Sequence, residues 1–387
     1  MAHPMLGSGS ANPTDFKIAF ARPFFGREEE AAAAAAIRSG WVAAGPRLAE
    51  FEERFAEYCR VRHAVGVSSW TTGAFLVLHA WGVGPGDEVI VPSLTFIASV
   101  NVIRHVGATP VFAEIEERTF NIDPTDVAQK ISSRTKVLLP IDQVGLPCDI
   151  DAINSLAKRY HLKVLDDAAC AVGSRNRGRR IGGLADVTVF SLHARKVITT
   201  GEGGMILTND TKLAERLRLL RHQGMSLSDV ARHSMRPTAF EGYPEIGYNF
   251  RITDIQAAIG LKQLDRIDDL IARRRKIAKR YSDAIGDHPI LTPPYVPVEY
   301  EPNWQSYQVS LRHSAAARRE EIMDWLYDQG IPTRRGIMAS HLEPPYYGMA
   351  SLPVTEDVAR RTIQLPMHSG LTVQEQDFII DALRRIS

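Results

Sequence analysis

Short apolar runs alternate with amphipathic stretches over the first 210 residues of the chain. Most of the seven runs are continuously apolar, which is typical of strands in a sheet buried on both faces. Helical spacing of apolar residues between or after several of them indicates a doubly wound α/β domain. The predicted strands cover residues 63–69, 88–93, 109–115, 136–142, 163–168, 187–193 and 204–209, and the predicted helices cover 71–82, 95–107, 149–160 and 210–222.

Further helices are predicted on both sides of this alternating region. Residues 27–40 form an alanine-rich helix, and residues 47–59 carry apolar side chains at helical spacing. A long amphipathic pattern over 254–281 predicts one helix that links two domains. We therefore divide the chain into a disordered arm or expression remnant (1–15), a large domain (16–250), the linking helix (251–285) and a smaller C-terminal α+β domain (286–387).

Composition narrows the class of protein. The chain has 387 residues, 44% of them apolar, and a net charge of +1. It can therefore bury a large core, and it lacks the basic field that nucleic acid would require. Its apolar runs are too short for a membrane span, and we expect no signal peptide. Three widely spaced cysteines, Cys59, Cys148 and Cys170, predict neither a disulfide framework nor a metal site, so we expect a cytoplasmic protein.

Three of the predicted strands end in residues that carry chemistry. In open α/β sheets, ligands bind outside the carboxyl ends of the strands. Thr71 and Thr72 open a helix whose free N–H groups would suit a phosphate, Asp167 could pair with a ring-nitrogen cation, and Lys196 could form an imine. A phosphate, a pyridinium and an aldehyde together describe pyridoxal 5′-phosphate.

Each of these groups also has an ordinary structural interpretation. A lone lysine after a strand is usually solvated, paired aspartates often cap a turn, and "SSWTT" (68–72) is by default a helix cap. The order and spacing of all three within one alternating domain favour the cofactor. The glycines of "TTGEGG" (199–204) would let the chain reverse tightly after the lysine and approach other backbone closely.

Four long blocks of the chain carry a family resemblance. Residues 39–59, 82–103, 247–266 and 365–372 stand in the order and spacing found in the sugar aminotransferases of the DegT/DnrJ/EryC1/StrS type. The resemblance runs from about Phe20 to Ile386. It implies a fold-type I architecture, with a mostly parallel central sheet sandwiched by helices and a smaller C-terminal α+β domain.

The resemblance implies roles for several residues of the large domain. Lys196 matches the Schiff-base lysine, which also serves as the base for the proton shift. Asp167 matches the carboxylate under the pyridine nitrogen, and Phe96 matches the aromatic that stacks on the ring, although a core position is its plain alternative. Residues that match phosphate ligands are Ser191, Thr71 and Thr72.

Other matches concern the substrate and a second subunit. Asn249 and Arg251 match residues lent to the neighbouring subunit, which implies a homodimer with shared active sites. His341 matches a C-terminal loop that approaches the substrate. Arg334 and Arg335, in "TRRG" (333–336), could bind an anion of the substrate or simply form a solvated turn.

Three positions depart from the family pattern. Trp70 stands where the phosphate turn usually has glycine, so it either points away from the cofactor or narrows the pocket. Cys170 stands where glutamine or histidine often binds the cofactor, and a thiol is a weak partner. Asp142 begins "DQVG" where a histidine is common. Since Lys196 and Asp167 are retained, we expect an active enzyme with an altered pocket.

The resemblance predicts transfer of an amino group, from L-glutamate, to a keto-sugar carried on a nucleotide, with pyridoxamine phosphate as the intermediate form of the cofactor. Such a reaction would belong to amino-sugar, polysaccharide or glycoconjugate biosynthesis. An aminotransferase of a cyclitol or another carbocycle, and a non-transaminating enzyme of the same family, remain open. Dehydrating relatives tend to carry histidine in place of Lys196, which argues against that branch. A protein that kept only the fold is disfavoured by the intact set of Lys196, Asp167 and Ser191.

Overall fold

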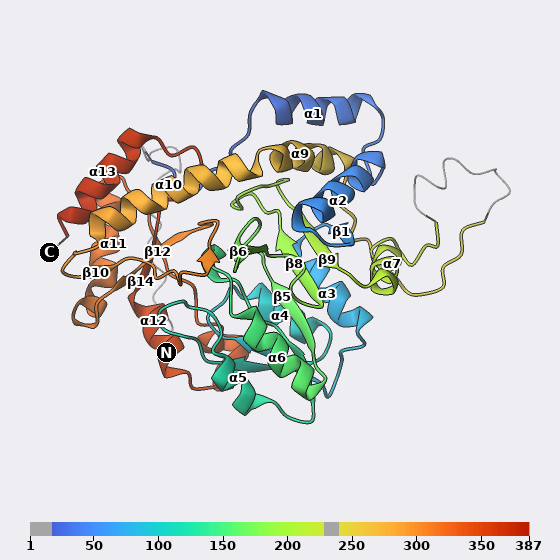
Figure 1. The fold of residues 1–387 in the computed structure, drawn as a ribbon, viewed down its shortest axis with the longest axis horizontal. Coiled ribbons are helices and arrows are strands. Elements are labelled where there is room, and N and C mark those ends of the chain that lie inside the picture. Colours follow the sequence, from blue (N-terminus) through green and yellow to red (C-terminus); the bar gives the residue numbers. More distant parts are fainter. Residues whose placement is uncertain (1–17, 228–239, 387) are drawn as a thin grey trace.

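A computed structural model describes residues 18–227 and 240–386 (Figure 1). Its described residues contain a seven-stranded sheet of order β1-β9-β8-β5-β4-β2-β3, in which β9 runs antiparallel to both neighbours and the other pairs are parallel. The predicted mostly parallel sheet is thus confirmed. The strands are β1 (His63–Val67), β2 (Glu88–Pro92), β3 (Thr109–Ala113), β4 (Thr135–Leu138), β5 (Lys163–Asp167), β8 (Val187–Ser191) and β9 (Gly204–Thr208).

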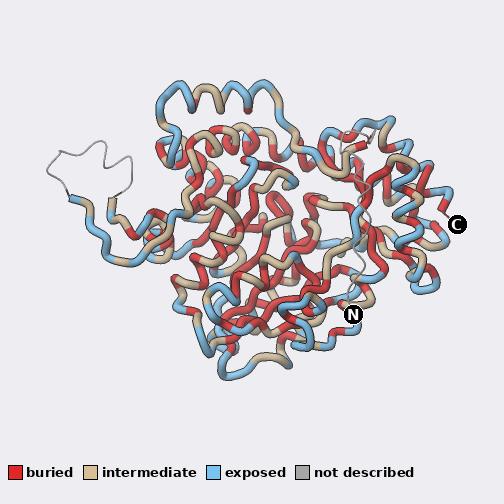
Figure 2. Tube along the Cα trace, turned by 180° about the vertical axis from the view of Figure 1, so that it is seen from behind, coloured by how far each residue is buried: buried red, intermediate tan, exposed pale blue. Residues whose placement is uncertain are grey.

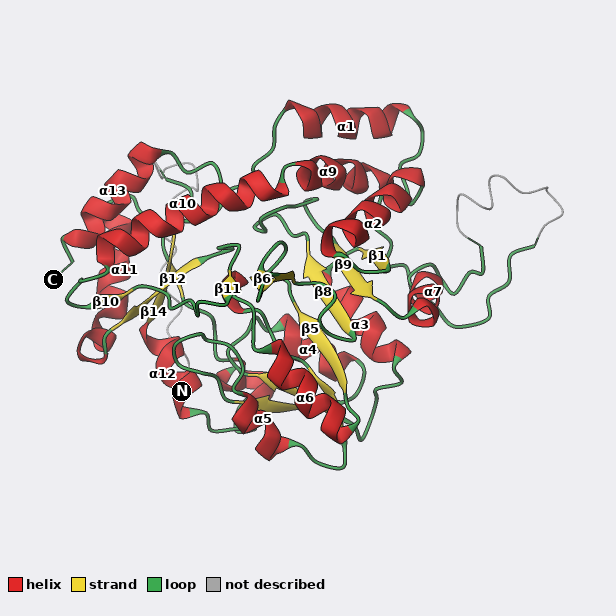
Figure 3. Cartoon of the chain, viewed as in Figure 1, coloured by secondary structure: helices red, strands yellow, loops and turns green. Residues whose placement is uncertain are grey.

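Helices cover both faces of this sheet (Figure 3). Side chains of α3 (Trp70–Ala80), α4 (Ala98–His105) and α7 (Thr211–Leu220) share one core cluster with alternate sheet residues. The opposite face packs in two clusters. The helices on that face are α2 (Pro46–Cys59), α5 (Pro124–Lys130), α6 (Ile150–Tyr160) and α9 (Asp254–Asp265).

The strands are mostly buried, whereas helix α1 (Arg27–Arg38) has Glu29 and Ala36 as its buried residues and is otherwise exposed or half-buried (Figure 2). Burial of both sheet faces explains why the strands read as continuous apolar runs rather than as alternating ones. Within the described residues, no helix combines the length and the apolar character needed to cross a bilayer.

The single linking helix that we expected over 254–281 is wrong in one respect, because the chain leaves helical geometry at Arg266, where φ is −116° and ψ is 11°. Helix α9 packs on α1 and α2, and α10 (Ile267–Ile285) continues toward α13 (Val373–Arg384), as Figure 1 shows. Neither proline nor glycine marks the break. Instead, Arg266 Nη2 donates a hydrogen bond to Phe24 O at 2.7 Å and lies 3.3 Å from Glu29.

The C-terminal part is built on an antiparallel sheet of order β10-β12-β14-β13, with strands β10 (Leu291–Thr292), β12 (Tyr307–Leu311), β13 (Arg334–Arg335) and β14 (Thr362–Leu365). Helices α11 (Arg319–Asp328), α12 (Pro353–Arg361) and α13 accompany it, with the short 3-10 helices η2 (His313–Arg318), η3 (Ser340–Leu342) and η4 (Pro344–Tyr346). A further 3-10 helix, η1 (Gln143–Gly145), lies in the large domain between β4 and α6.

Chain segments cross between the two parts of the molecule. Ile18 is buried in the core of the C-terminal part, beside Ile277 and Tyr281 of α10. In a third, small sheet, β11 (Tyr300–Glu301) pairs with β6 (Arg175–Asn176) of the large domain, and β6 pairs in turn with β7 (Arg179–Arg180). The predicted arm (1–15) lies outside the described residues.

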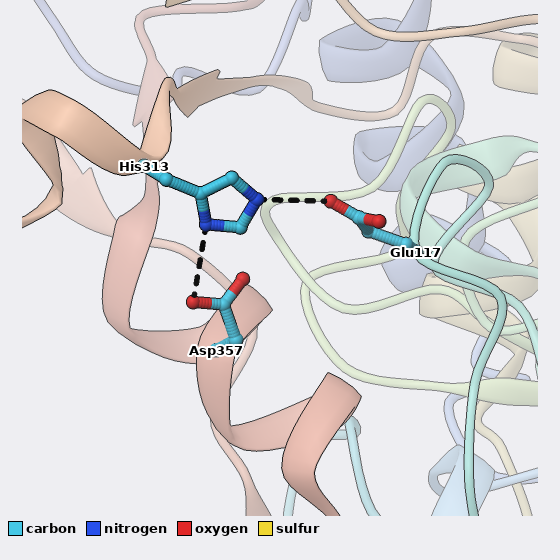
Figure 4. A group of neighbouring side chains, drawn as sticks. All are labelled: Glu117, His313 and Asp357. Atoms are coloured by element: carbon cyan, nitrogen blue, oxygen red, sulfur yellow. Dashed lines mark ion pairs between the residues drawn. The ribbon is translucent and has the colours of Figure 1, made fainter.

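An ion-pair cluster also joins the two parts (Figure 4). His313 Nε2 lies 3.7 Å from Glu117, in the loop after β3, and His313 Nδ1 lies 3.6 Å from Asp357 of α12. Buried Arg361 pairs with both acids, with its Nε 2.6 Å from Asp357 Oδ2. Arg361 supplies positive charge to both carboxylates, so the cluster forms a charge-paired contact between the large domain and the C-terminal part.

Candidate active site

Lys196 lies in the loop that joins β8 to β9, and its side chain is half buried. Its Nζ donates a hydrogen bond to Cys170 Sγ at 3.2 Å, and its main-chain N–H donates to His193 O at 2.9 Å. Cys170 follows the end of β5, the strand next to β8. The fold therefore brings the lysine amine to the carboxyl end of β5, where Asp167 lies.

Asp167 is the last residue of β5 and is buried. Its Oδ2 accepts a hydrogen bond from Ser99 Oγ at 2.7 Å, and its Oδ1 accepts one from Ala169 N–H at 3.1 Å. Burial raises the pKa of Asp167 to about 6, while Ser99, Ala169 and the charge of Lys196 act in the opposite direction. The carboxylate is therefore ionised at neutral pH and would attract a buried cation such as a protonated ring nitrogen.

Two more buried carboxyl groups adjoin Asp167. The main-chain N–H of Asp142 donates to Asp167 O at 3.0 Å. A carboxylate oxygen of Asp142, one of Asp166 and the Sγ of Cys148 all lie within 4.8 Å of one another. Burial raises the pKa of Asp142 to about 7. It also raises the pKa of Asp166 well above its usual range, and the charges of Asp142 and Asp167 add to this effect. Burial and the repulsion between neighbouring carboxylates therefore both favour the protonated forms of Asp142 and Asp166.

The predicted phosphate seat lies at the N-terminus of α3. Ser69 is the N-cap: its Oγ accepts from Thr72 N–H at 3.1 Å, and Thr72 Oγ1 accepts from Ser69 N–H at 3.0 Å. Ser191, at the end of β8, pairs with Gly204, whose backbone touches that of Ser69. Ser191, Thr71 and Thr72 thus lie near one another, beside free helix N–H groups that suit an anion.

The glycines after the lysine meet the requirements predicted for them. Gly201 and Gly203 have φ values of +83° and +158°. A Cβ on Gly204 would lie 2.6 Å from the carbonyl group of Ser69. The positive φ disfavours a side chain at Gly201 and Gly203, and crowding against Ser69 disfavours one at Gly204. The turn therefore lets β9 begin against the N-terminus of α3.

Trp70 and Phe96 have opposite environments. Trp70 is buried in the core cluster of α3, so of its two predicted orientations the structure has the one that points away from the turn. Its indole Nε1 has no hydrogen-bond partner among the described atoms. Phe96, between β2 and α4, is 66% exposed, which excludes the core alternative and leaves its ring accessible to a planar ligand.

Asn249 and Arg251 stand on either side of Phe250, whose C=O accepts a hydrogen bond from Ser68 N–H at 2.8 Å. Asn249 is exposed and forms a β-bridge with His222, and Arg251 Nη1 lies 2.5 Å from His222 Nδ1. Arg251 lines a pocket of about 890 Å³ between the start of α2 and the residues at and after α7, whose lining does not include Lys196.

His341 does not face an open site, contrary to its predicted contact with substrate. It is 1% exposed, its Nδ1 lies 2.6 Å from Ser93 Oγ and its Nε2 lies 3.4 Å from Glu356. The ring nitrogens are thus directed at residues of the same chain, and His341 holds η3 against the end of β2. Sequence similarity alone could not show this burial.

Arg334 and Arg335 are exposed in β13. This exposure agrees both with an anion-binding role and with the solvated alternative. The guanidinium of Arg334 lies over the Phe20 ring at 5.1 Å, and Arg335 lies 3.5 Å from Glu320. Among the described residues, no hydrogen bond or ion pair joins either arginine to Lys196, and their role in anion binding stays a prediction.

Sequence reasoning missed three buried residues that hold this site together. Ser99 bonds Asp167, as described above. Asn303 Nδ2 donates to Cys170 O at 2.8 Å, and Gln305 bonds the main chain on both sides of Lys196. The only sequence signal for Ser99 was a hydroxyl-rich segment after a strand. Asn303 and Gln305 had none, because they approach from the C-terminal part.

The described residues fit pyridoxal phosphate. A lysine amine, a buried ionised carboxylate, an accessible aromatic ring and a helix N-terminus with nearby hydroxyl groups lie at the carboxyl ends of adjacent strands. The residues that would hold the group are Lys196, Asp167, Phe96, Ser191, Thr71 and Thr72, with Cys170 next to the amine.

Comparison with known proteins places this arrangement in a family. The sequence profile of the DegT/DnrJ/EryC1/StrS aminotransferase family matches residues 24–384. The chain is 38% identical to the spore coat polysaccharide biosynthesis protein SpsC of Bacillus subtilis, over 95% of this chain and 97% of SpsC. It is 40% identical to the GDP-perosamine synthase of Caulobacter vibrioides, over 89% of this chain and 92% of the synthase.

Solved structures agree. The Streptococcus pneumoniae protein Spr1654 superposes with a TM-score of 0.89 at 30% identity, over 95% of this chain and 98% of that one, and its solved forms are described as PLP-form and PMP-form. The family and this neighbour imply pyridoxal phosphate as the cofactor. With the fold, the site and the family profile in agreement, the chain belongs to the DegT/DnrJ/EryC1/StrS aminotransferase family and is an aminotransferase.

Proposed function

We propose that this enzyme moves an amino group from L-glutamate to the keto group of a nucleotide-linked sugar. The observation that carries the proposal is the meeting of the Lys196 amine with the end of β5, where Asp167 is buried and ionised. The sugar substrate is supported by the names of the relatives, a GDP-perosamine synthase and a polysaccharide biosynthesis protein.

Pyridoxal phosphate, when bound, supplies an aldehyde that can carry an amino group and a ring that can take up an electron pair. Lys196 Nζ would hold the aldehyde, and Asp167 would keep the ring nitrogen protonated, because its carboxylate is ionised above a pKa of about 6. Phe96 would cover one ring face. Ser191 and the N-terminus of α3 would bind the phosphate.

Lys196 would also move the proton that transamination requires. When not bonded to the cofactor, its Nζ would be a free amine that could take up a proton from the substrate and return it. Cys170 Sγ, 3.2 Å from Nζ, is a weak hydrogen-bond acceptor.

We also propose a homodimer with shared active sites. Exposed Asn249 and half-buried Arg251, beside a pocket of about 890 Å³, are available to a neighbouring subunit. Exposed apolar side chains at Ile37 (59%) and Val42 (47%) fit a surface that a second copy would cover. Arg251, Arg334 and Arg335 are the cations that we propose for the anionic groups of donor and acceptor.

The test is the visible absorbance of the purified protein before and after addition of L-glutamate. We expect a cofactor band that glutamate shifts, and that a nucleotide-linked keto-sugar then restores. Borohydride reduction followed by peptide mapping should locate the cofactor on Lys196, and Lys196→Ala should abolish turnover whereas Lys262→Ala, on α9, should not.

Three results would contradict parts of this proposal. Near-normal turnover by Lys196→Ala would remove the central residue. Restoration of the band by a cyclitol ketone, but not by nucleotide-linked keto-sugars, would favour the carbocycle alternative. A band that glutamate leaves unchanged would exclude glutamate as donor.

A further inference from the structure

The side chain of Gln305 bonds the two peptide groups that flank Lys196. Its Oε1 accepts from Val197 N–H at 2.9 Å, and its Nε2 donates to Arg195 O at 2.7 Å. Gln305 precedes β12 in the C-terminal part and is buried. A carboxamide has one donor side and one acceptor side, so it pairs here with the lysine loop as a peptide group of a neighbouring strand would.

This bond matters because the loop around Lys196 lies beyond the end of the sheet. Strand β8 ends at Ser191 and β9 begins at Gly204. Between them the backbone forms turns, with Lys196 N–H bonded to His193 O and Thr200 N–H bonded to Leu192 O. Direction of the lysine side chain therefore depends on contacts from outside the sheet, of which Gln305 supplies one on each side.

Gln305 is itself held firmly. Its main-chain N–H donates to Asn303 Oδ1 at 2.8 Å, and its C=O accepts from Nη1 of buried Arg274 at 3.1 Å. Asn303 Nδ2 also donates to Cys170 O at 2.8 Å. One short segment of the C-terminal part thus fixes the main chain at Lys196 and at Cys170, the residue whose Sγ contacts the lysine amine.

We propose that Gln305 is a positioning residue for Lys196: by bonding Arg195 O and Val197 N–H it fixes the direction from which the lysine amine meets the cofactor. This inference rests on the proposed function of Lys196. It assigns to the C-terminal part a share in the catalytic geometry, because movement of that part would shift both peptide groups. Displacement of a catalytic group by about 1 Å can lower a rate about 100-fold.

The test compares Gln305→Leu with Gln308→Leu. Gln308 is another buried glutamine, three residues further on, and its Oε1 accepts from Ile337 N–H and Gln364 Nε2. Both variants lose buried amide bonds, so they control for general destabilisation. Gln305→Glu keeps an acceptor for Val197 N–H, loses the donor to Arg195 O, and carries the test if Gln305→Leu does not fold.

Two measurements are made on each protein. In the cofactor-free protein, hydrogen exchange of the Val197 amide should accelerate at least about 10-fold in Gln305→Leu, because that N–H loses its acceptor, and stay unchanged in Gln308→Leu. Gln305→Glu retains this acceptor, so it is compared by kcat and KM. In the cofactor-loaded protein, kcat should fall about 10- to 100-fold in the Gln305 variant, with a smaller change in KM, since positioning acts on the reacting geometry.

The outcomes separate the two proposals. If borohydride mapping of the wild-type protein does not find the cofactor on Lys196, the proposed function fails. If the cofactor is on Lys196 but Gln305→Leu matches Gln308→Leu in Val197 exchange and in kcat, the positioning role alone is overturned. Where Gln305→Leu does not fold, a kcat of Gln305→Glu equal to that of Gln308→Leu overturns it.

Discussion

Removal of the Ser99 hydroxyl tests how this chain keeps Asp167 ionised. Ser99 Oγ donates to Asp167 Oδ2 at 2.7 Å in a buried setting, and this bond opposes the rise in the pKa of Asp167 that burial causes. A hydrogen bond to a charged group contributes about 1.5–3 kcal/mol. Since 1.36 kcal/mol corresponds to about one pH unit, Ser99→Ala should raise the pKa of Asp167 by about 1–2 pH units above its value of about 6.

The consequence is a change in the pH dependence of cofactor binding. Below its pKa, Asp167 is neutral and cannot attract a protonated ring nitrogen, so affinity should decline as the pH falls through that pKa. In the wild-type protein the decline should begin near pH 6, and in Ser99→Ala about 1–2 pH units higher. Near pH 7 the variant should therefore bind the cofactor up to about 10-fold more weakly, and it should recover near pH 9.

The assay is titration of cofactor-free protein with pyridoxal phosphate, followed by absorbance between about pH 5 and pH 9. Comparison of variant with wild type removes the titration of the cofactor itself. Ser282→Ala is the control, since Ser282 also loses a hydroxyl contact, to Tyr307 at 2.8 Å, far along α10. If the Ser99→Ala curve has the wild-type midpoint, the hydrogen bond does not set the protonation of Asp167 and the reasoning is refuted.

Three more changes test other features. The contribution of Asp142 to stability should become less favourable as the pH rises from about pH 4 to pH 7, because burial raises its pKa to about 7 and folding then opposes its ionisation. In urea unfolding, Asp142→Asn should therefore gain up to about 4 kcal/mol relative to the wild type over this range, and parallel pH curves would contradict it. Gly204→Ala should lower the free energy of unfolding by about 1–3 kcal/mol and weaken cofactor binding, because the added Cβ meets the Ser69 carbonyl. An unchanged melting temperature and an unchanged cofactor affinity would exclude the close approach. Arg361→Met should lower the free energy of unfolding by about 1–2 kcal/mol without changing the cofactor spectrum, since its carboxylate partners are partly exposed. A loss of stability too small to measure would show that the ion-pair cluster does not hold the two parts together.

The predicted elements agree with the structure where hydrophobic periodicity is decisive. Continuous apolar runs located all seven strands of the large sheet, since burial on both faces leaves little choice of residue. Helix α5 was missed, although Asp123 caps it and Pro124 begins it, because seven residues are too few to show a period. The break at Arg266 was missed because it arises from contacts with Phe24 and Glu29 rather than from a helix-breaking residue.

The candidate site divides in the same way. Lys196 and Asp167 were found because each follows a strand, and the topology of an α/β sheet collects such ends at one edge. Ser99 bonds Asp167 across 68 residues of sequence, and Gln305 bonds Val197 across 108 residues. No local pattern marks such partners.

Sequence alone therefore determined the fold class, the family resemblance and the two residues expected to carry the chemistry. Both the burial of a strand and the residues at its end can be recognised from a short stretch of neighbouring residues. Tertiary structure decided the environment of side chains that the sequence left open: Trp70 is buried in the core, Phe96 is exposed, and His341 is buried in contact with Ser93. These choices depend on which distant groups fill the space around a residue, and only the packed chain brings those groups together.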